Sequence, residues 1–486
     1  MADVTGDPTD ILDSPQAGGS ILRGGVLRAG GYVLGTLLSL AGIALITRHL
    51  GLEEFGRYSV VLSLITVVGA VTDAGMGTLG LREFSQRRGE DRDELMRTLL
   101  GLRLALTLLG AGCATLIALT LGYRAELVLG AVLAGLGLVL TVGQTTLGIP
   151  LGASLRNGTL AAIDLLRQAL TLAGFATLVL LGAGTAAFLA VPIPAGVVLV
   201  VIVAVLVRGQ VSLRPRVAPR AWLALLGTSV GFALATAVGT IYVYTAQILT
   251  GFVASDEQVG LFAAAFRVFV VLAAVPGLLI TVAFPVLARA ARDDRDRLAY
   301  GVGKLLDVSA LLGVGAAVGL LTGAPAIIEV MAGPDFAGAA RALRVLSLAV
   351  VMSFLLAAWG FALLSLHDHR SLLLANVAAL ATSALAVALL ARGSGAEGAA
   401  LGVVLGELVL AAGYLLGLTR GRPELRPRAA VPLKALAVAA PAVAVVFALG
   451  LPAAPAALVA LVLYALGILA LRAVPQELLD LAPGRR

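Results

Sequence analysis

Charged side chains are scarce in this sequence of 486 residues. Asp, Glu, Lys and Arg together make up only 13% of it, against roughly 25% in an ordinary soluble domain. Hydrophobic residues make up 59%, and a water-soluble fold could not cover so much apolar surface with so few polar groups. A soluble globular domain is therefore excluded as the main architecture.

Features of enzymes and of disulfide-rich proteins are also missing. Cys113 is the only cysteine, so no disulfide can form within the chain. No stretch between apolar segments is long enough for a soluble catalytic domain, and no GxxxxGK[ST] phosphate-binding motif occurs. The loops contain no Ser/His/Asp arrangement and no paired-carboxylate motif. We therefore predict neither an enzyme nor a cofactor, and we interpret His367-Asp368-His369 as a turn rather than a metal site.

Long apolar segments fill most of the chain instead. As a helix, about 20 apolar residues span roughly 30 Å of hydrocarbon. We therefore predict an all-α membrane protein with about 14 transmembrane helices. These lie near residues 26–47, 58–80, 98–121, 126–147, 160–182, 186–207, 222–250, 260–287, 305–330, 345–366, 371–391, 397–418, 433–450 and 454–472. Only a short Gly-rich break separates the fifth helix from the sixth, so a count of thirteen stays open.

Positive charges are concentrated in every second loop. The net charge of +7 would suggest nucleic-acid binding in a soluble protein, but this alternation is what the positive-inside rule predicts for cytoplasmic loops. We therefore predict a protein of the cell inner membrane with both termini cytoplasmic and no nucleic-acid partner. Residues 1–22 carry four aspartates where a signal peptide would be basic, and they are predicted to be a disordered cytoplasmic tail.

An internal repeat divides the predicted helices. The run EEFGRY at residues 53–58 enters the second helix, and EQVGLF at residues 257–262 enters the eighth, about 204 residues later. Both runs hold an acid, a hydrophobic residue, a glycine and an aromatic in the same register. Because transporters are often built from repeats, we predict two pseudo-symmetric six-helix lobes followed by two further helices. The predicted units are residues 23–220 (helices 1–6), 221–420 (helices 7–12) and 421–486 (helices 13–14 and a short cytoplasmic tail).

Four short motifs resemble those of a known family. RHLGLEEFGRY at residues 48–58 is similar to the R-x-LG-x-x-x-FG-x-Y entry to helix 2 of polysaccharide flippases, and DAGMG at 73–77 resembles the D-x-G run that ends that helix. VGLFAAAFR at 259–267 resembles the family's VG-x-Y-x-x-A-x-R entry to helix 8, and GPDF at 333–336 resembles the loop before helix 10. Family members often carry an Asp late in helix 7, where this chain has Ala246-Gln247, so no cation site is carried over there.

On these motifs the chain is identified as a member of the O-antigen-type transporters in the multidrug/oligosaccharidyl-lipid/polysaccharide exporter superfamily. The resemblance implies a flippase that moves a polyprenyl-pyrophosphate-linked oligosaccharide across the cytoplasmic membrane by alternating access between two lobes. The implied partners are this glycan, membrane lipids and other polysaccharide-assembly proteins. Two alternatives stay open: a cation-coupled drug or small-molecule antiporter of the same superfamily, and a membrane glycosyltransferase or polymerase.

Arginines in or near the membrane are the candidate substrate ligands. A charge at the membrane centre costs roughly 2.5–3.5 kcal/mol and therefore needs a partner or water. A guanidinium group binds phosphate oxygens bidentately, so we predict that Arg48, Arg103, Arg167 and Arg267 line a cavity and hold the pyrophosphate. An ion pair between helices is an equal alternative for Arg103 and Arg267. An ion pair with Asp164, one turn away, is favoured for Arg167.

Acids in the predicted helices are candidates for proton or cation coupling. They are Asp73, Asp164, Asp307 and Glu407, of which Glu407 lies deepest in its apolar segment. A passive buried acid that is hydrogen-bonded to a neighbour is the alternative for Glu407. Gln144 is interpreted as a hydrogen-bond partner between helices rather than a sugar ligand. No metal site is predicted.

Overall fold

The computed structural model describes residues 15–73, 75–120, 122–154, 156–293, 295–420, 422, 425–426 and 429–473. These residues form α-helices and one short 3-10 helix, and none of them lies in a β-strand. Of the predicted tail at residues 1–22, the first 14 residues lie outside the described part, and the first helix begins at Pro15.

The helices follow one another with short connections. In chain order they are α1 (Pro15–Asp73), α2 (Met76–Gln86), α3 (Gly89–Thr120), α4 (Ala125–Leu147), α5 (Ile149–Ala153), α6 (Asn157–Leu180), α7 (Thr185–Ala190), α8 (Pro192–Leu206), α9 (Pro219–Val253), α10 (Asp256–Asp293), α11 (Arg295–Ala332), α12 (Ala339–Ser365), α13 (His369–Thr419), α14 (Ala430–Ala448) and α15 (Ala453–Ala470). The 3-10 helix η2 (Pro334–Phe336) connects α11 to α12.

The described residues contain eleven helices that are long and apolar enough to cross a membrane, which confirms an all-helical membrane protein. Two of these, Leu34–Gln86 and His369–Thr419, have 53 and 51 residues, more than twice the roughly 20 that one crossing needs. Each contains a glycine in a non-helical conformation: Gly51 in α1 has φ 72°, and Gly395 in α13 has φ 51°. The helical path is therefore broken at each of these glycines. Glycine suits both positions because a positive φ strains a residue that has a Cβ atom.

The predicted fifth and sixth helices are separate in the structure. The fifth corresponds to α6, and the sixth corresponds to the candidate span Thr185–Leu206, which α7 and α8 build together. Pro192 lies at the start of α8, where a proline is tolerated because the first turn of a helix leaves its N–H groups unbonded.

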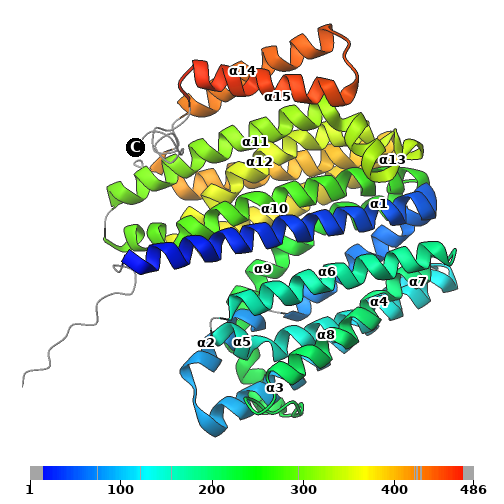
Figure 1. Cartoon of the computed structure of the whole chain (residues 1–486), viewed down its shortest axis with the longest axis vertical. Coiled ribbons are helices and arrows are strands. Elements are labelled where there is room, and N and C mark those ends of the chain that lie inside the picture. The colour runs from blue at the N-terminus through cyan, green and yellow to red at the C-terminus, as the bar shows by residue number, and fades with distance from the viewer. Residues whose placement is uncertain are drawn as a thin grey trace, which may run out of the picture.

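The helices form two groups, one on each side of α1 (Figure 1). Helices α2 to α8 gather in the lower part of the view, and α10 to α13 gather in the upper part. Helix α1 lies between them and packs against both α6 and α10. Helices α14 and α15 pack on α11 at the outer edge of the upper group.

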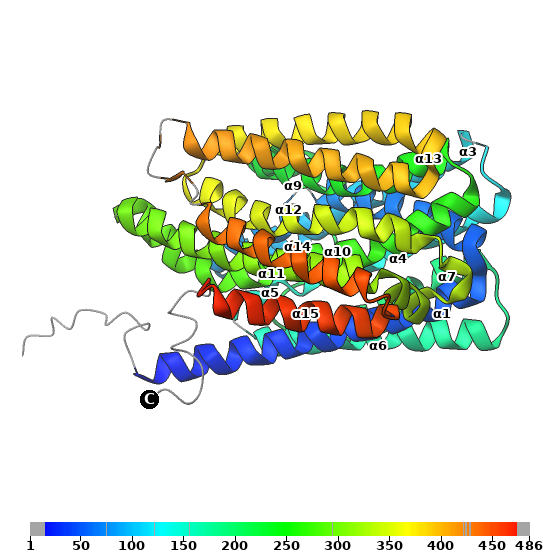
Figure 2. The same ribbon diagram turned by 90° about the horizontal axis from the view of Figure 1, so that it is seen from above.

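The long helices run roughly parallel to one common axis (Figure 2), as a bundle that crosses a bilayer requires. Helix α1 begins and α15 ends at the same end of the bundle. Helix α1 turns back at the opposite end (Figure 2), and because its break lies at Gly51 we call this end the Gly51 end.

Candidate functional site

Helices α1 and α10 cross in backbone contact near the Gly51 end. A Cβ atom on Gly56 would lie 2.8 Å from the backbone oxygen of Asp256 and 2.8 Å from the backbone nitrogen of Gly260. A Cβ atom on Gly260 would lie 2.1 Å from the backbone oxygen of Leu52. Real Cβ atoms do not approach so closely, so only glycine fits at either position. We call this contact, with Arg57 beside it, the α1–α10 junction.

The contact at the junction is reciprocal. Gly56 and Gly260 are separated by the same 204 residues that relate the two runs of the sequence repeat, and so are Leu52 and Asp256. Gly56 meets Asp256, and Gly260 meets Leu52. The two copies of the motif therefore pack against each other with matching residues, as in a self-complementary interface around a two-fold axis.

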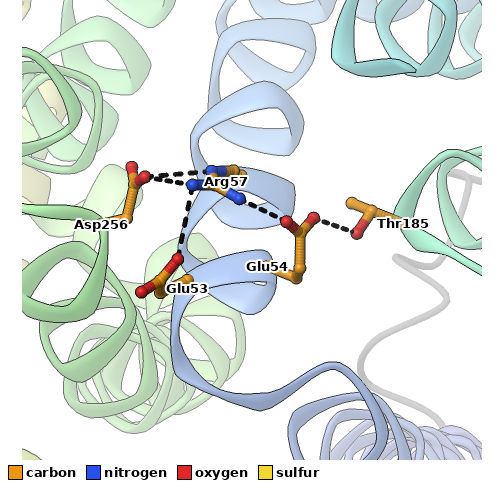
Figure 3. Close-up of polar contacts among 5 residues, drawn as sticks. All are labelled: Glu53, Glu54, Arg57, Thr185 and Asp256. Carbon is orange, nitrogen blue, oxygen red and sulfur yellow. Dashed lines mark hydrogen bonds and ion pairs between the residues drawn. The ribbon is translucent and has the colours of Figure 1, made fainter. Parts of the chain in front are cut away.

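The guanidinium group of Arg57 joins three carboxylates at the junction (Figure 3). Its Nε donates to Asp256 Oδ2 on α10 at 3.1 Å, and it pairs with Glu54 and Glu53 on its own helix. The Arg57 side chain is only 13% exposed, whereas Glu53, Glu54 and Asp256 are 64%, 35% and 45% exposed, so the cation is mostly out of solvent and the acids are partly in it. Arg57 thus provides a charged link between α1 and α10.

Each copy of the repeated motif also bonds to the start of a further helical segment. Glu54 Oε2 accepts a hydrogen bond from Thr185 Oγ1, in the first turn of α7, at 2.6 Å. The matching residue Gln258 accepts one through Oε1 from the backbone N–H of Ala396, just after the break in α13, at 3.0 Å. The same position therefore plays the same structural role in both copies, with a carboxylate in one and an amide in the other.

A cavity of about 230 Å³ lies beside the junction, between α1, α6, α9 and α10. We call it the central cavity. Phe55 and Tyr58 line it and also belong to the hydrophobic core near the junction. The polar residues that line it are Ser39, Tyr58, Ser59, Ser63, Thr66, Gln168, Thr171, Tyr244, Gln247 and Arg267. Among the described lining residues there is one cation and no Asp or Glu.

Two polar side chains in the central cavity lack partners that their chemistry requires. Gln247 is 1% exposed, and neither atom of its amide has a hydrogen-bond partner in the described structure. Arg267 donates from Nη2 to Ser39 Oγ at 3.2 Å, while its buried Nε has no partner and no described carboxylate pairs with it. Buried polar groups normally have hydrogen-bond partners, so these two side chains can bind water or a ligand that supplies the missing hydrogen bonds.

The other predicted arginines do not line the central cavity. Arg48 lies at the Gly51 end, and its Nη2 donates to the backbone oxygens of Glu329 at 3.3 Å and Val330 at 2.8 Å. Both carbonyls lie in the last turn of α11, where a cation is favourable because it complements the helix dipole. Arg167 forms an ion pair with Asp164 and lines a second, smaller cavity in the lower group of helices.

Arg103 and Asp73 form an ion pair between α3 and the end of α1. The side chain of Arg103 is 4% exposed and that of Asp73 is 38% exposed. The buried Nη1 and Nε atoms of Arg103 have no partner in the described structure. The structure thus brings together one candidate substrate ligand and one candidate coupling acid, which the sequence did not connect.

Glu407 is buried in α13, away from any described cation. Its Oε1 accepts a hydrogen bond from Tyr242 on α9 at 3.1 Å, and its Oε2 lies 3.5 Å from Ser353 Oγ on α12. Both partners are hydroxyl groups, so the carboxyl group links three helices without an ion pair. The remaining coupling candidate, Asp307, is half-buried on α11.

Asp368 lies in the connection between α12 and α13, outside the apolar helices. It accepts from the backbone N–H of Ser371 at 3.2 Å and pairs with Arg422 at 3.4 Å. Partial burial alone would raise its pKa, but the hydrogen bonds from Ser371 and the charge of Arg422 outweigh burial and lower the pKa. In the part of the chain that the structure describes, no group of three or more His, Cys, Asp or Glu residues is placed to hold a metal ion.

Of the residues that line the central cavity, the sequence predicted Arg267 but not most of the others. Ser39 and Gln168 sit in apolar helices and match no motif, whereas Gln247 falls at the position late in its helix where family members often carry an Asp. The junction could have been found, because the offset of the repeat already pairs Gly56 with Gly260.

Comparison with known sequences gives a family. The sequence model of the family described as "Polysaccharide biosynthesis protein" matches residues 45–341, more than half of the chain. These residues include both repeated motifs, the junction and every residue that lines the central cavity from α6, α9 and α10. A search of curated proteins found no sequence that matches this chain.

Several solved structures share the fold. The lipid II flippase MurJ in an inward closed conformation superposes with a TM-score of 0.78 and 11% sequence identity, covering 93% of this chain and 100% of that chain. An inward-facing multidrug resistance MATE transporter gives a TM-score of 0.67 and 15% identity over 82% of this chain and 98% of that chain. A transporter of the same MOP superfamily from Pyrococcus furiosus gives 0.57 and 16% identity over 82% of this chain and 95% of that chain. At these identities the likeness establishes the fold.

Proposed function

The chain belongs to the polysaccharide biosynthesis protein family, and we propose that it is a flippase that moves a polyprenyl-pyrophosphate-linked oligosaccharide across the cytoplasmic membrane. The MurJ structure with a similar fold is described as a lipid II flippase, which is a transporter of a lipid-linked substrate. The proposed cargo is a precursor of a cell-surface polysaccharide, and the glycan leaves the protein chemically unchanged.

Arg267 in the central cavity is the observation that carries this proposal. It is the one cation among the described lining residues, and no described carboxylate neutralises it. Hydroxyl and amide side chains surround it, and these bind sugars without competing for the cation. A pyrophosphate would supply the missing acceptors of the guanidinium group, and the lining would contact the sugars.

The position of the cavity supports alternating access. In our proposal the chain crosses the membrane fourteen times in two six-helix lobes, residues 23–220 and 221–420, followed by two further helices, with both termini in the cytoplasm. The junction would then close the cavity toward the outer side, and cargo would enter from the cytoplasm. Reciprocal glycine contact supports a symmetric closure, because two matched surfaces can separate and meet again without repacking side chains.

Glycan transport in cells tests the proposal. Arg267→Ala is expected to abolish export of the glycan while the protein remains abundant, and Arg267→Lys is expected to restore only part of it, because lysine does not bind phosphate bidentately. Arg214→Ala serves as the matched control, since Arg214 is exposed in the connection between α8 and α9. Deleting the gene should trap the lipid-linked glycan in the inner leaflet. Accumulation in the outer leaflet, or a changed glycan linkage, would refute a flippase.

A cation-coupled antiporter of the same superfamily is the second candidate. Glu407 supports it, because a buried carboxyl group that bonds only to the hydroxyls of Tyr242 and Ser353 can take up and release a proton without breaking an ion pair. Glu407→Gln should abolish proton-driven efflux of a cationic dye if this second function holds. If dye efflux is absent in the native protein, Glu407 is a coupling group of the flippase or a structural acid.

A further inference from the structure

A second cavity of about 180 Å³ opens beside the central one, within the lower group of helices. It lies between α4, α6 and α8, and it shares the lining residues Thr171 and Pro192 with the central cavity. The two cavities therefore adjoin at these two residues. We call the second cavity the side pocket.

Three side-chain oxygen atoms that line the side pocket can only accept hydrogen bonds. Thr141 Oγ1 donates its proton to the backbone oxygen of Gly137 at 2.9 Å, and Thr171 Oγ1 donates to that of Arg167 at 2.8 Å. Each hydroxyl oxygen can then only accept. Gln144 is 4% exposed, and its Oε1 has no partner in the described structure. A group that fills the pocket must therefore bring a donor.

The charge and shape of the side pocket restrict the occupant further. Arg167 is already paired with Asp164, and its buried Nε has no partner in the described structure, so Arg167 Nε and the amide nitrogen of Gln144 are the donors that the pocket offers beside this paired cation. Ala195 and Leu199 form an apolar wall. The volume corresponds to about six water molecules at roughly 30 Å³ each, which is room for a substituent but not for a whole sugar chain.

We propose that the side pocket binds an N-acyl substituent, such as an acetamido group, of the sugar that the central cavity holds. Its N–H would donate to Gln144, its carbonyl oxygen would accept from Arg167 Nε, and its methyl group would pack on Ala195 and Leu199. A carboxylate brings no donor and finds no free cation. This inference rests on the proposed function, because it assigns the specificity of the same cargo.

Binding of two defined lipids to the purified full-length chain tests the inference. The probes are polyprenyl pyrophosphate carrying N-acetylglucosamine and the same lipid carrying glucose. The native chain should bind the acetamido probe roughly tenfold more tightly, because the hydroxyl group of glucose lacks the carbonyl oxygen that accepts from Arg167 Nε and the methyl group that packs on the apolar wall. Gln144→Leu should remove this preference, and Gln210→Leu, the same exchange at an exposed amide between α8 and α9, should keep it.

The outcomes separate the inference from the proposed function. If both probes bind equally and Arg267→Ala weakens both, the flippase proposal stands and the side pocket holds water only. If neither probe binds the native chain, both ideas fail. A second variant, Ala195→Val, fills the pocket without removing a polar group. It tests the assignment even if the Gln144→Leu protein does not fold. It should lower the affinity for the acetamido probe alone, and an equal loss for both probes would overturn the assignment.

Discussion

The junction and the central cavity occupy the same interface between α1 and α10, but they differ in how their polar groups are satisfied. At the junction, Arg57 is shared among three carboxylates and the backbones touch at Gly56 and Gly260. About two helical turns further along α10, Arg267 keeps a buried atom without a partner in the described structure, and so does Gln247 on the neighbouring α9. Polar groups that bond to one another across a contact hold its two surfaces together. Buried polar groups without a partner instead favour the binding of a ligand that supplies one.

The largest effect is expected from Gly260→Ala, which tests whether the junction holds the two surfaces closed. The added Cβ would lie 2.1 Å from a backbone oxygen, so the junction must open or distort at a cost of about 3 kcal/mol. In a Cys113→Ser background, Ser59→Cys in the cavity wall should then react faster with a maleimide that cannot cross the membrane. Gly112→Ala is the control, because no atom lies within 4 Å of its added Cβ. Unchanged labelling and normal transport would refute a closed junction.

Gln247→Leu should leave the stability of the fold unchanged or raise it, but it should lower transport. Replacing an amide that has no partner with an apolar group of similar size removes a desolvation penalty, so stability should stay constant or rise by about 1 kcal/mol. Glycan export should fall, because the cavity loses a hydrogen-bonding group. Thermal unfolding and export, measured on the same preparation, check both. A less stable variant would mean that Gln247 supports the fold.

Arg57→Gln should weaken the junction more mildly. The Coulomb attraction to Asp256, Glu54 and Glu53 disappears, but each of these acids is partly exposed and keeps water, so the loss should be about 1 kcal/mol. A double-mutant cycle with Asp256→Asn isolates the link between α1 and α10. A coupling energy near zero would assign closure to the glycines alone.

The smallest effect is expected at Asp368, which links neighbouring helices of the upper group and not the two sides of the cavity. Its pKa is lowered in the folded chain, so its stabilisation is complete above the ordinary pKa of about 3.9 and is lost as the pH falls below that value. Unfolding curves between pH 5 and pH 3 should lose less than about 1 kcal/mol in stability relative to Asp368→Asn. Maleimide labelling of Ser59→Cys should not change over the same pH range.

The sequence predicted the fold class well because apolar length and helical rise are local properties. The run at residues 48–58 and the run at 259–267 also identified the family, which the match over residues 45–341 confirms. Individual charged residues were harder to assign. Arg103 and Arg267 looked alike in the sequence, since both sit in apolar helices, yet one pairs with Asp73 and the other lines the central cavity.

By itself, the sequence determined that the chain is a helical membrane protein with a repeated motif around Gly56 and Gly260. Hydrophobicity, loop charge and repeat spacing are each encoded within a few dozen residues. Only the tertiary structure decided that the two motifs meet, that Arg57 links them, and that the Gln247 amide and Gln144 Oε1 have no partner in the described structure. Those facts depend on which helix faces which, and in a chain of nearly uniform apolar helices this is set by packing between segments far apart in the sequence.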